Sequence, residues 1–159
     1  MEILITEIPT KILKGRTIET SFARQETSKL WKAFRASITQ SKKLNPTKFY
    51  SIQRYGSELK EGVLNLDTVF EKCAAIDCDL EKIPSDFEEV VLEGGIYAVF
   101  EHQGSPLDFQ NSLHNFIQKW LPKSGYELDA RNHFETFDDK YDPFSENSVE
   151  LVWIPIIKT

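Results

Sequence analysis

The 159-residue sequence has only two cysteines, and it contains no run of 18 apolar residues. Two cysteines are too few for the disulfide framework that supports many small secreted domains. Without a long apolar run there is no candidate membrane helix, and the N-terminal residues lack the short apolar core of a secretory signal. We therefore expect a cytoplasmic protein that does not bind membranes.

Positive charge is also scarce. Lys and Arg number 19 against 25 Asp and Glu, so the net charge is −6, and no cluster of basic residues offsets it. An acidic surface repels a phosphate backbone, so we expect no nucleic-acid binding by this chain alone. Neutral or cationic small molecules are easier for such a protein to accommodate.

Motifs of several common enzyme classes are missing. The sequence has no phosphate-binding Walker loop, no dinucleotide fingerprint and no Gly-x-Ser-x-Gly nucleophile turn. His102, His114 and His133 lack the spacing of metal ligands. Cys73 and Cys78 are five residues apart on an expected strand and so point to opposite faces. We expect no metal, no cofactor and no disulfide.

The stretch from Gly94 to Pro106 has a clear order of elements. Residues 97–101 are rich in strand-forming side chains, and Gly104 ends that strand. Ser105 is placed to cap a helix that begins at Pro106. Apolar residues then recur at helical spacing, which predicts an amphipathic helix over 106–121.

The first half of the chain repeats this order. Strand, helix, strand and strand are expected at 11–18, 21–39, 48–55 and 68–79, and the second half continues with strands at 133–137 and 149–157. We predict an α+β fold in a single domain over 1–159, made of duplicated βαββ units at about 1–83 and 84–159. Pseudo-two-fold symmetry would then give a curved antiparallel sheet, two helices on one face and a central ligand cleft.

Residues 94–104, Gly-Gly-Ile-Tyr-Ala-Val-Phe-Glu-His-Gln-Gly, resemble the signature of the GyrI-like domain, also called the AraC-type effector-binding domain. In the second half, further similar segments lie at 116–128, 134–138, 141–143 and 150–156. In the first half the similarity is looser and lies at 14–16 and 30–34. The sequence departs from the resemblance at 69–78, where similar proteins often carry an aromatic–glycine pair and this chain has Phe-Glu-Lys-Cys-Ala-Ala at 70–75.

The resemblance implies the duplicated βαββ fold. It also implies binding of bulky, often cationic, aromatic compounds in a cleft floored by a carboxylate. Many relatives carry this domain fused to a helix-turn-helix, whereas here it fills the chain.

Glu135 is the residue that matches the acid position of the family. It shares an expected strand face with His133 and Phe137. A carboxylate among aromatic rings in a cleft is poorly solvated, and a bound cation would relieve that cost and gain cation–π attraction. The alternative is a solvated glutamate on a strand surface, because Glu is rarely buried.

Four further aromatic residues are candidates for the ligand-binding wall: Tyr50, Trp153, Tyr97 and Tyr141. Their alternative role is ordinary packing on strands. Trp31 and Trp120 lie on the apolar stripes of the two expected helices, which favours a place in the core.

Three functions remain open at this point. The first is a stand-alone protein that senses or sequesters a hydrophobic, cationic small molecule. The second is a hydrolase of strained cyclopropane-containing toxins, as in some similar proteins, with Glu135 activating water and Tyr50 or Tyr141 donating a proton. The third is an interaction protein of the DNA-gyrase-inhibitor type, which would dock a protein partner.

Overall fold

The computed structural model describes residues 2–24, 26–41, 44, 46–56, 65–78, 84–104, 106–141 and 147–159, with the backbone alone at Pro106 and Leu107. Within these ranges the chain forms one large antiparallel sheet and two helices. The strands are β1 (Leu4–Ile8), β2 (Lys11–Thr20), β3 (Lys48–Arg54), β4 (Phe70–Ile76), β5 (Glu88–Leu92), β6 (Gly95–Gln103), β7 (Tyr126–Leu128), β8 (His133–Asp138) and β9 (Val149–Lys158). The helices are α1 (Thr27–Gln40) and α3 (Pro106–Asn115), and α3 continues into a π-helical turn (Phe116–Trp120) and a 3-10 turn (Leu121–Lys123).

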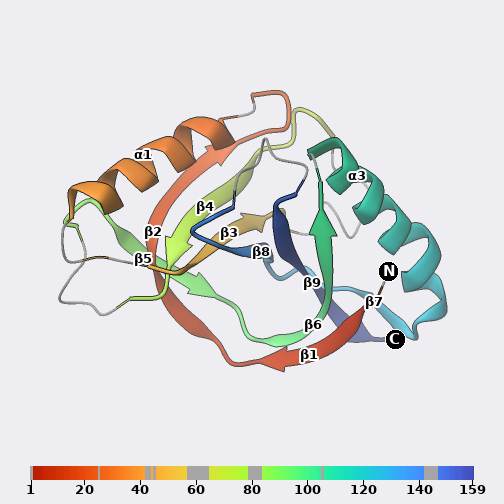
Figure 1. Cartoon of the computed structure of the whole chain (residues 1–159). Coiled ribbons are helices and arrows are strands. Elements are labelled where there is room, and N and C mark those ends of the chain that lie inside the picture. Colours follow the sequence, from red (N-terminus) through yellow and green to blue (C-terminus); the bar gives the residue numbers. More distant parts are fainter. Residues whose placement is uncertain are drawn as a thin grey trace.

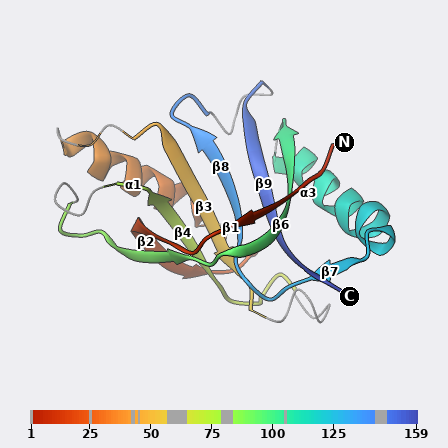
Figure 2. The same cartoon turned by 90° about the horizontal axis from the view of Figure 1, so that it is seen from below.

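The nine described strands follow the order β1-β6-β9-β8-β3-β4-β2-β5, with β7 paired to the end of β9. Figures 1 and 2 show a strongly curved sheet, with α1 near one end and α3 near the other. The predicted α+β class is confirmed, and so is the order strand–helix–strand–strand, which occurs as β2-α1-β3-β4 and β6-α3-β8-β9. The two-fold symmetry, the duplication and the single-domain boundaries stay predictions.

Both helices lie on the same face of the sheet, as the strand register demonstrates. Ala74, Ser51, Glu135, Val152 and Phe100 stand directly opposite one another across β4, β3, β8, β9 and β6. Directly paired residues of an antiparallel sheet point to the same side. Ala74 packs in the core under α1, whereas Val152 and Phe100 pack in the core under α3. Both helices therefore cover the same face of the sheet.

The core consists of three clusters. Under α1, Phe34 and Ile38 pack against Phe49 and Phe137. Under α3, the rings of Phe116 and Trp120 in the π-helical turn pack against the helix-facing residues of β6 and β9. The third cluster lies on the opposite face, inside the curve of the sheet, and contains Leu13, Tyr50, Ile52, Cys73, Ala75, Val90, Leu92, Tyr97, Val99 and Phe134. Trp31 and Trp120 pack against the first two clusters, as the helical stripes predicted.

Two glycines meet specific backbone requirements. A Cβ on Gly15 would come within 1.9 Å of the Ala74 carbonyl oxygen, so β2 and β4 can approach only because no side chain is present there. Gly95 has a φ of +132°, where other residues are strained, and the Arg131 guanidinium lies against it. Gly95 is the first residue of β6 and follows the short connection from β5.

The first helix begins later than predicted. The expected start at residue 21 is wrong, because α1 runs from Thr27 to Gln40. Residues 21–24 form turns instead: the Ser21 carbonyl accepts the Arg24 amide, and the Ala23 amide donates to the carbonyl of Leu66. The ring of Phe22 contacts the ring of Phe70 in a tilted arrangement, with the centroids 5.0 Å apart, and so holds this segment against the sheet.

Other boundaries differ by a few residues. The strand expected at 68–79 is shorter, at Phe70–Ile76, and the predicted helix cap Ser105 lies outside the described residues. Strand β7 was not predicted, since three residues offer too little alternation to detect. Cys73 and Cys78 are thiols that are not joined in a disulfide. Within the described ranges, neither helix is both long and apolar enough to cross a bilayer.

Candidate functional site

Between the α1 and α3 cores, the helix-covered face of the sheet carries polar side chains instead of apolar ones. We call this set the polar strip; its members come from β3, β4, β8 and β9 and are Ser51, Gln53, Lys72, His133, Glu135 and Glu150. Strand pairing fixes their arrangement, because Ser51 lies opposite Glu135, and Gln53 lies between Lys72 and His133. Figure 1 shows these central strands between the two helices.

Glu135 is linked to Lys72 through a single amide. With its oxygen oriented toward the donors, Gln53 accepts hydrogen bonds from Lys72 Nζ and from Ser51 Oγ (3.3 Å), and its Nε2 donates to Glu135 Oε2 at 2.8 Å. The chain Lys72–Gln53–Glu135 therefore joins a buried ammonium to a carboxylate. Hydrogen bonds that link charged groups in this way stabilise charges that have left water.

Burial shifts the titration of this network. Desolvation raises the pKa of Glu135, and the Lys72 ammonium and the Gln53 hydrogen bond oppose the rise. Desolvation and the neighbouring Glu135 raise the pKa of Glu150 to about 8, with Lys72 and a hydrogen bond to Tyr141 opposing. Burial lowers the pKa of Lys72, although both carboxylates favour its charged form. The strip thus holds two acids against one ammonium.

Aromatic rings border the strip on its β3–β4 side. Tyr55 lies edge-on to His133 at 5.3 Å and contacts Phe70 at 4.9 Å. Desolvation raises the pKa of Tyr55 and lowers that of His133 to about 4, so both rings are uncharged at neutral pH. They supply apolar surface without adding charge beside Glu135.

A second aromatic group borders the strip on the α1 side. Phe137 contacts Tyr141 at 4.5 Å and Trp31 at 5.2 Å. The hydroxyl of Tyr141 is hydrogen-bonded to Glu150, so this group also reaches the acidic part of the strip. Carboxylates between two aromatic groups are an arrangement that suits a cation with apolar substituents.

The structure brings together three of the six predicted ligand-binding residues. Glu135, Phe137 and Tyr141 lie on the helix-covered face, and Glu135 shares that face with His133 as predicted. Tyr50, Trp153 and Tyr97 belong to the cluster on the opposite face. The indole of Trp153 stacks on Phe134 at 5.1 Å, and Tyr97 is edge-on to the same ring at 5.2 Å. The register therefore does not place these three rings beside Glu135.

Sequence reasoning missed Lys72, Gln53, Glu150 and Tyr55. One signal was available for the first of these, because it lies in the segment 70–75 that departs from the family pattern. That the other three lie near Glu135 depends on the strand register. The sequence does not reveal this register until the strand pairings are known. Two polar residues two positions apart on β3 do not by themselves reveal what they face.

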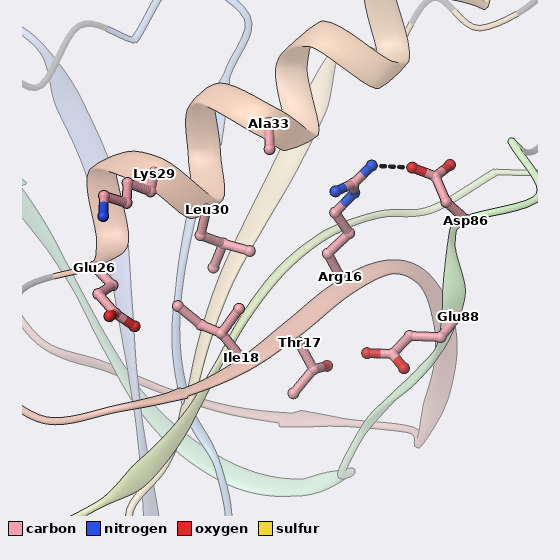
Figure 3. A pocket seen from close by; sticks show the side chains of 9 residues that line it. All are labelled: Arg16, Thr17, Ile18, Glu26, Lys29, Leu30, Ala33, Asp86 and Glu88. Atoms are coloured by element: carbon pink, nitrogen blue, oxygen red, sulfur yellow. Dashed lines mark hydrogen bonds and ion pairs between the residues drawn. The ribbon is translucent and has the colours of Figure 1, made fainter.

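A separate cavity of about 470 Å³ lies between α1 and β2 (Figure 3). Two of its charged side chains are paired with each other: Arg16 forms an ion pair with Asp86 and also donates to Ser37 Oγ at 2.8 Å. That ion pair is partly solvated, with Asp86 48% exposed. Because solvated pairs gain little from a ligand, we place the functional site at the polar strip and not at this cavity.

Metal binding has no support in the described ranges, where no three His, Cys, Asp or Glu side chains gather closely enough to hold an ion. The polar strip also contains a lysine, which would compete with a metal for its carboxylates.

The profile of the GyrI-like small-molecule-binding domain matches residues 1–157. The chain belongs to this family. The resemblance based on residues 94–156 is thereby confirmed, and it extends over both halves of the chain. No curated protein matches the sequence.

Solved structures with the GyrI-like fold are similar over nearly the whole chain. SAV2435, solved with bound tetraphenylphosphonium, is 17% identical with a TM-score of 0.70, over 99% of this chain and 94% of that one. EcmrR, solved in a complex with DNA, is 15% identical with a TM-score of 0.72, over 99% of this chain and 58% of that one. A hydrolase from Listeria innocua is 12% identical with a TM-score of 0.61, over 98% and 92%. At these identities the similarity establishes the fold.

Proposed function

We propose that this GyrI-like domain binds a hydrophobic, aromatic small molecule that carries a positive charge. The ligand would lie over the polar strip, between α1 and α3, with its charge near Glu135. The observation that carries the proposal is the Glu135 carboxylate itself, held on the helix-covered face with part of its surface still exposed. A partly desolvated carboxylate gains more from a cation than a solvated one does.

The charge of the strip favours the same ligand. Glu135 and Glu150 are two acids, whereas Lys72 is the one ammonium of the strip and His133 is neutral. At neutral pH the pKa of about 8 keeps Glu150 mostly protonated, and a bound cation would favour release of that proton. The rings of Phe137, Tyr141 and Tyr55 border the strip and offer faces for aromatic substituents.

The comparison with SAV2435 supports this choice of ligand class. That protein binds tetraphenylphosphonium, which is a cation surrounded by four aromatic rings. The shared fold makes tetraphenylphosphonium a suitable first probe for this chain. Triphenylphosphine oxide, which is aromatic and neutral, is the matching probe without a charge.

The test is calorimetric titration of the wild-type protein and of Glu135→Gln with both probes. The substitution keeps the shape of the side chain and removes its charge. Loss of one charge-assisted contact should weaken binding of the cation about tenfold to a hundredfold. Binding of triphenylphosphine oxide should change little, because it depends on buried apolar area.

The matched control is Glu101→Gln. Glu101 is exposed on β6 and pairs with Leu151, in the register row that points away from the helices. This control should bind both probes as the wild type does. Equal affinity of the wild type and Glu135→Gln for the cation would contradict the role of Glu135.

A second candidate function is hydrolysis, and the pair of acids favours it. With a pKa of about 8, Glu150 is mostly protonated at neutral pH, and Glu135 would be the base beside it. Tyr50 lies on the other face and cannot take the proton-donor role, whereas Tyr141 is hydrogen-bonded to Glu150. Conversion of a bound compound by substoichiometric protein would favour the hydrolase. The expectations about nucleic acid and a protein partner stay predictions.

A further inference from the structure

Lys72 is an unusual residue for the centre of a small-molecule site. It lies on β4 opposite Gln53, and its side chain is 9% exposed. An ammonium buried to this degree needs compensation by hydrogen bonds and opposite charge. Gln53 accepts its hydrogen bond, and Glu135 and Glu150 supply the negative charge.

The hydrogen bonds of Lys72 and Gln53 extend to the carboxylate that the ligand would use. Through the amide of Gln53, Lys72 is connected to the Glu135 carboxylate that we assign to the ligand cation. A lysine ammonium and a ligand cation close to one carboxylate also repel each other. One unit charge about 8 Å from another, at an effective dielectric constant of about 20, changes a binding constant by about tenfold to a hundredfold.

We propose that Lys72 is a specificity-determining residue, a cation built into the site that competes with the ligand for Glu135 and so limits how much positive charge a ligand can bring. This inference rests on the proposed function, since it concerns the same site. It identifies the ligand class as aromatic compounds with one positive charge. A second charge on the ligand would find no carboxylate left, because Glu150 is mostly protonated at neutral pH and Glu135 already faces the first charge.

The position of Lys72 in the sequence supports this role. It lies in segment 70–75, where this chain departs from the aromatic–glycine pair that its family resemblance leads us to expect. The structure places that departure against the polar strip, since Lys72 and Gln53 are register partners.

The experiment compares Lys72→Met with the wild type by calorimetric titration of tetraphenylphosphonium and triphenylphosphine oxide. Methionine keeps the length of the side chain and removes its charge. We expect Lys72→Met to bind the cation at least about tenfold more tightly, whereas its affinity for the neutral probe stays within about twofold of the wild type. Lys72→Gln, which retains hydrogen-bonding capacity, should give the same pattern and replaces the methionine variant if that one fails to fold.

The matched control is Lys14→Met. Lys14 is buried to a similar degree and pairs with Glu89 at 3.1 Å, on β2, which lies three strands away from β8 in the sheet. This variant should leave both affinities unchanged, because about 15 Å separates strands that are three apart. It shows whether loss of any buried lysine charge has the same effect.

Two outcomes separate this inference from the function on which it rests. Unchanged or weaker cation binding by folded Lys72→Met, with the wild type still binding both probes, would overturn the role of Lys72 and leave the proposed function intact. Failure of the wild type and of both Lys72 variants to bind either probe would overturn the proposed function, and this inference with it.

Discussion

The two faces of the central sheet differ sharply although they are made by neighbouring residues of the same strands. One register row, Ser51–Glu135–Val152, faces the helices, and the next, Ile52–Phe134–Trp153, faces the inside of the curved sheet. The first row carries an acid, whereas the second is apolar and closely stacked. One residue along a strand thus separates a candidate binding surface from a core, because side chains alternate between faces.

This contrast predicts different energetics for adjacent positions. On the inner face, stability depends on packing of large rings, and substitution should unfold the protein without touching a ligand. On the helix-covered face, charge compensation matters more than volume. The two predictions below test one face each, beginning with the larger effect.

Phe134→Ala should be the more destabilising change. Phe134 is 1% exposed and contacts the rings of Tyr50, Tyr97 and Trp153. Truncation of such a ring leaves a cavity, so the free energy of unfolding should fall by about 3–5 kcal/mol in urea titrations. At a temperature where the variant remains folded, its affinity for tetraphenylphosphonium should stay close to that of the wild type. A loss of less than about 1 kcal/mol would contradict the assignment of Phe134 to a packed core.

Glu150→Gln should change how stability depends on pH. The pKa of Glu150 is raised from 4.5 to about 8 in the folded protein, so the folded state binds its proton more tightly than the unfolded state does. Its contribution to stability is complete below about pH 4.5 and is lost as the pH rises through 8. Between pH 6.5 and 9, the free energy of unfolding of the wild type should fall by about 2 kcal/mol relative to the variant.

His133 provides the internal check on that measurement. Its pKa is lowered to about 4, so its contribution is present above about pH 6.5 and is lost as the pH falls through 4. That window lies below the range used for Glu150. Urea titrations of both proteins at three pH values would separate the two groups, and a difference that is independent of pH would contradict a buried, protonated Glu150.

The sequence was most informative where side chains repeat with a clear period. Alternation along 133–137 correctly placed Glu135 on one face with His133 and Phe137, and helical spacing correctly placed Trp31 and Trp120 in the core. These predictions need only local geometry. They do not depend on which strands are neighbours.

Predictions that needed pairing between distant strands were less successful. Trp153 was expected to line the ligand-binding wall with Glu135, yet the register places it on the opposite face of the sheet. Lys72 and Gln53 come from separate strands and meet Glu135 only through the register of β4, β3 and β8. A long-range register and the partners of a buried charge cannot be derived from local patterns.

The most direct test of the central claim is a crystal structure of the protein with bound tetraphenylphosphonium. The account predicts the phosphonium over the polar strip between α1 and α3, with Glu135 as its nearest carboxylate and the rings of Phe137 or Tyr55 against its phenyl groups. Density for the cation in the cavity beside Arg16 and Asp86, or against Trp153 on the inner face, would contradict it.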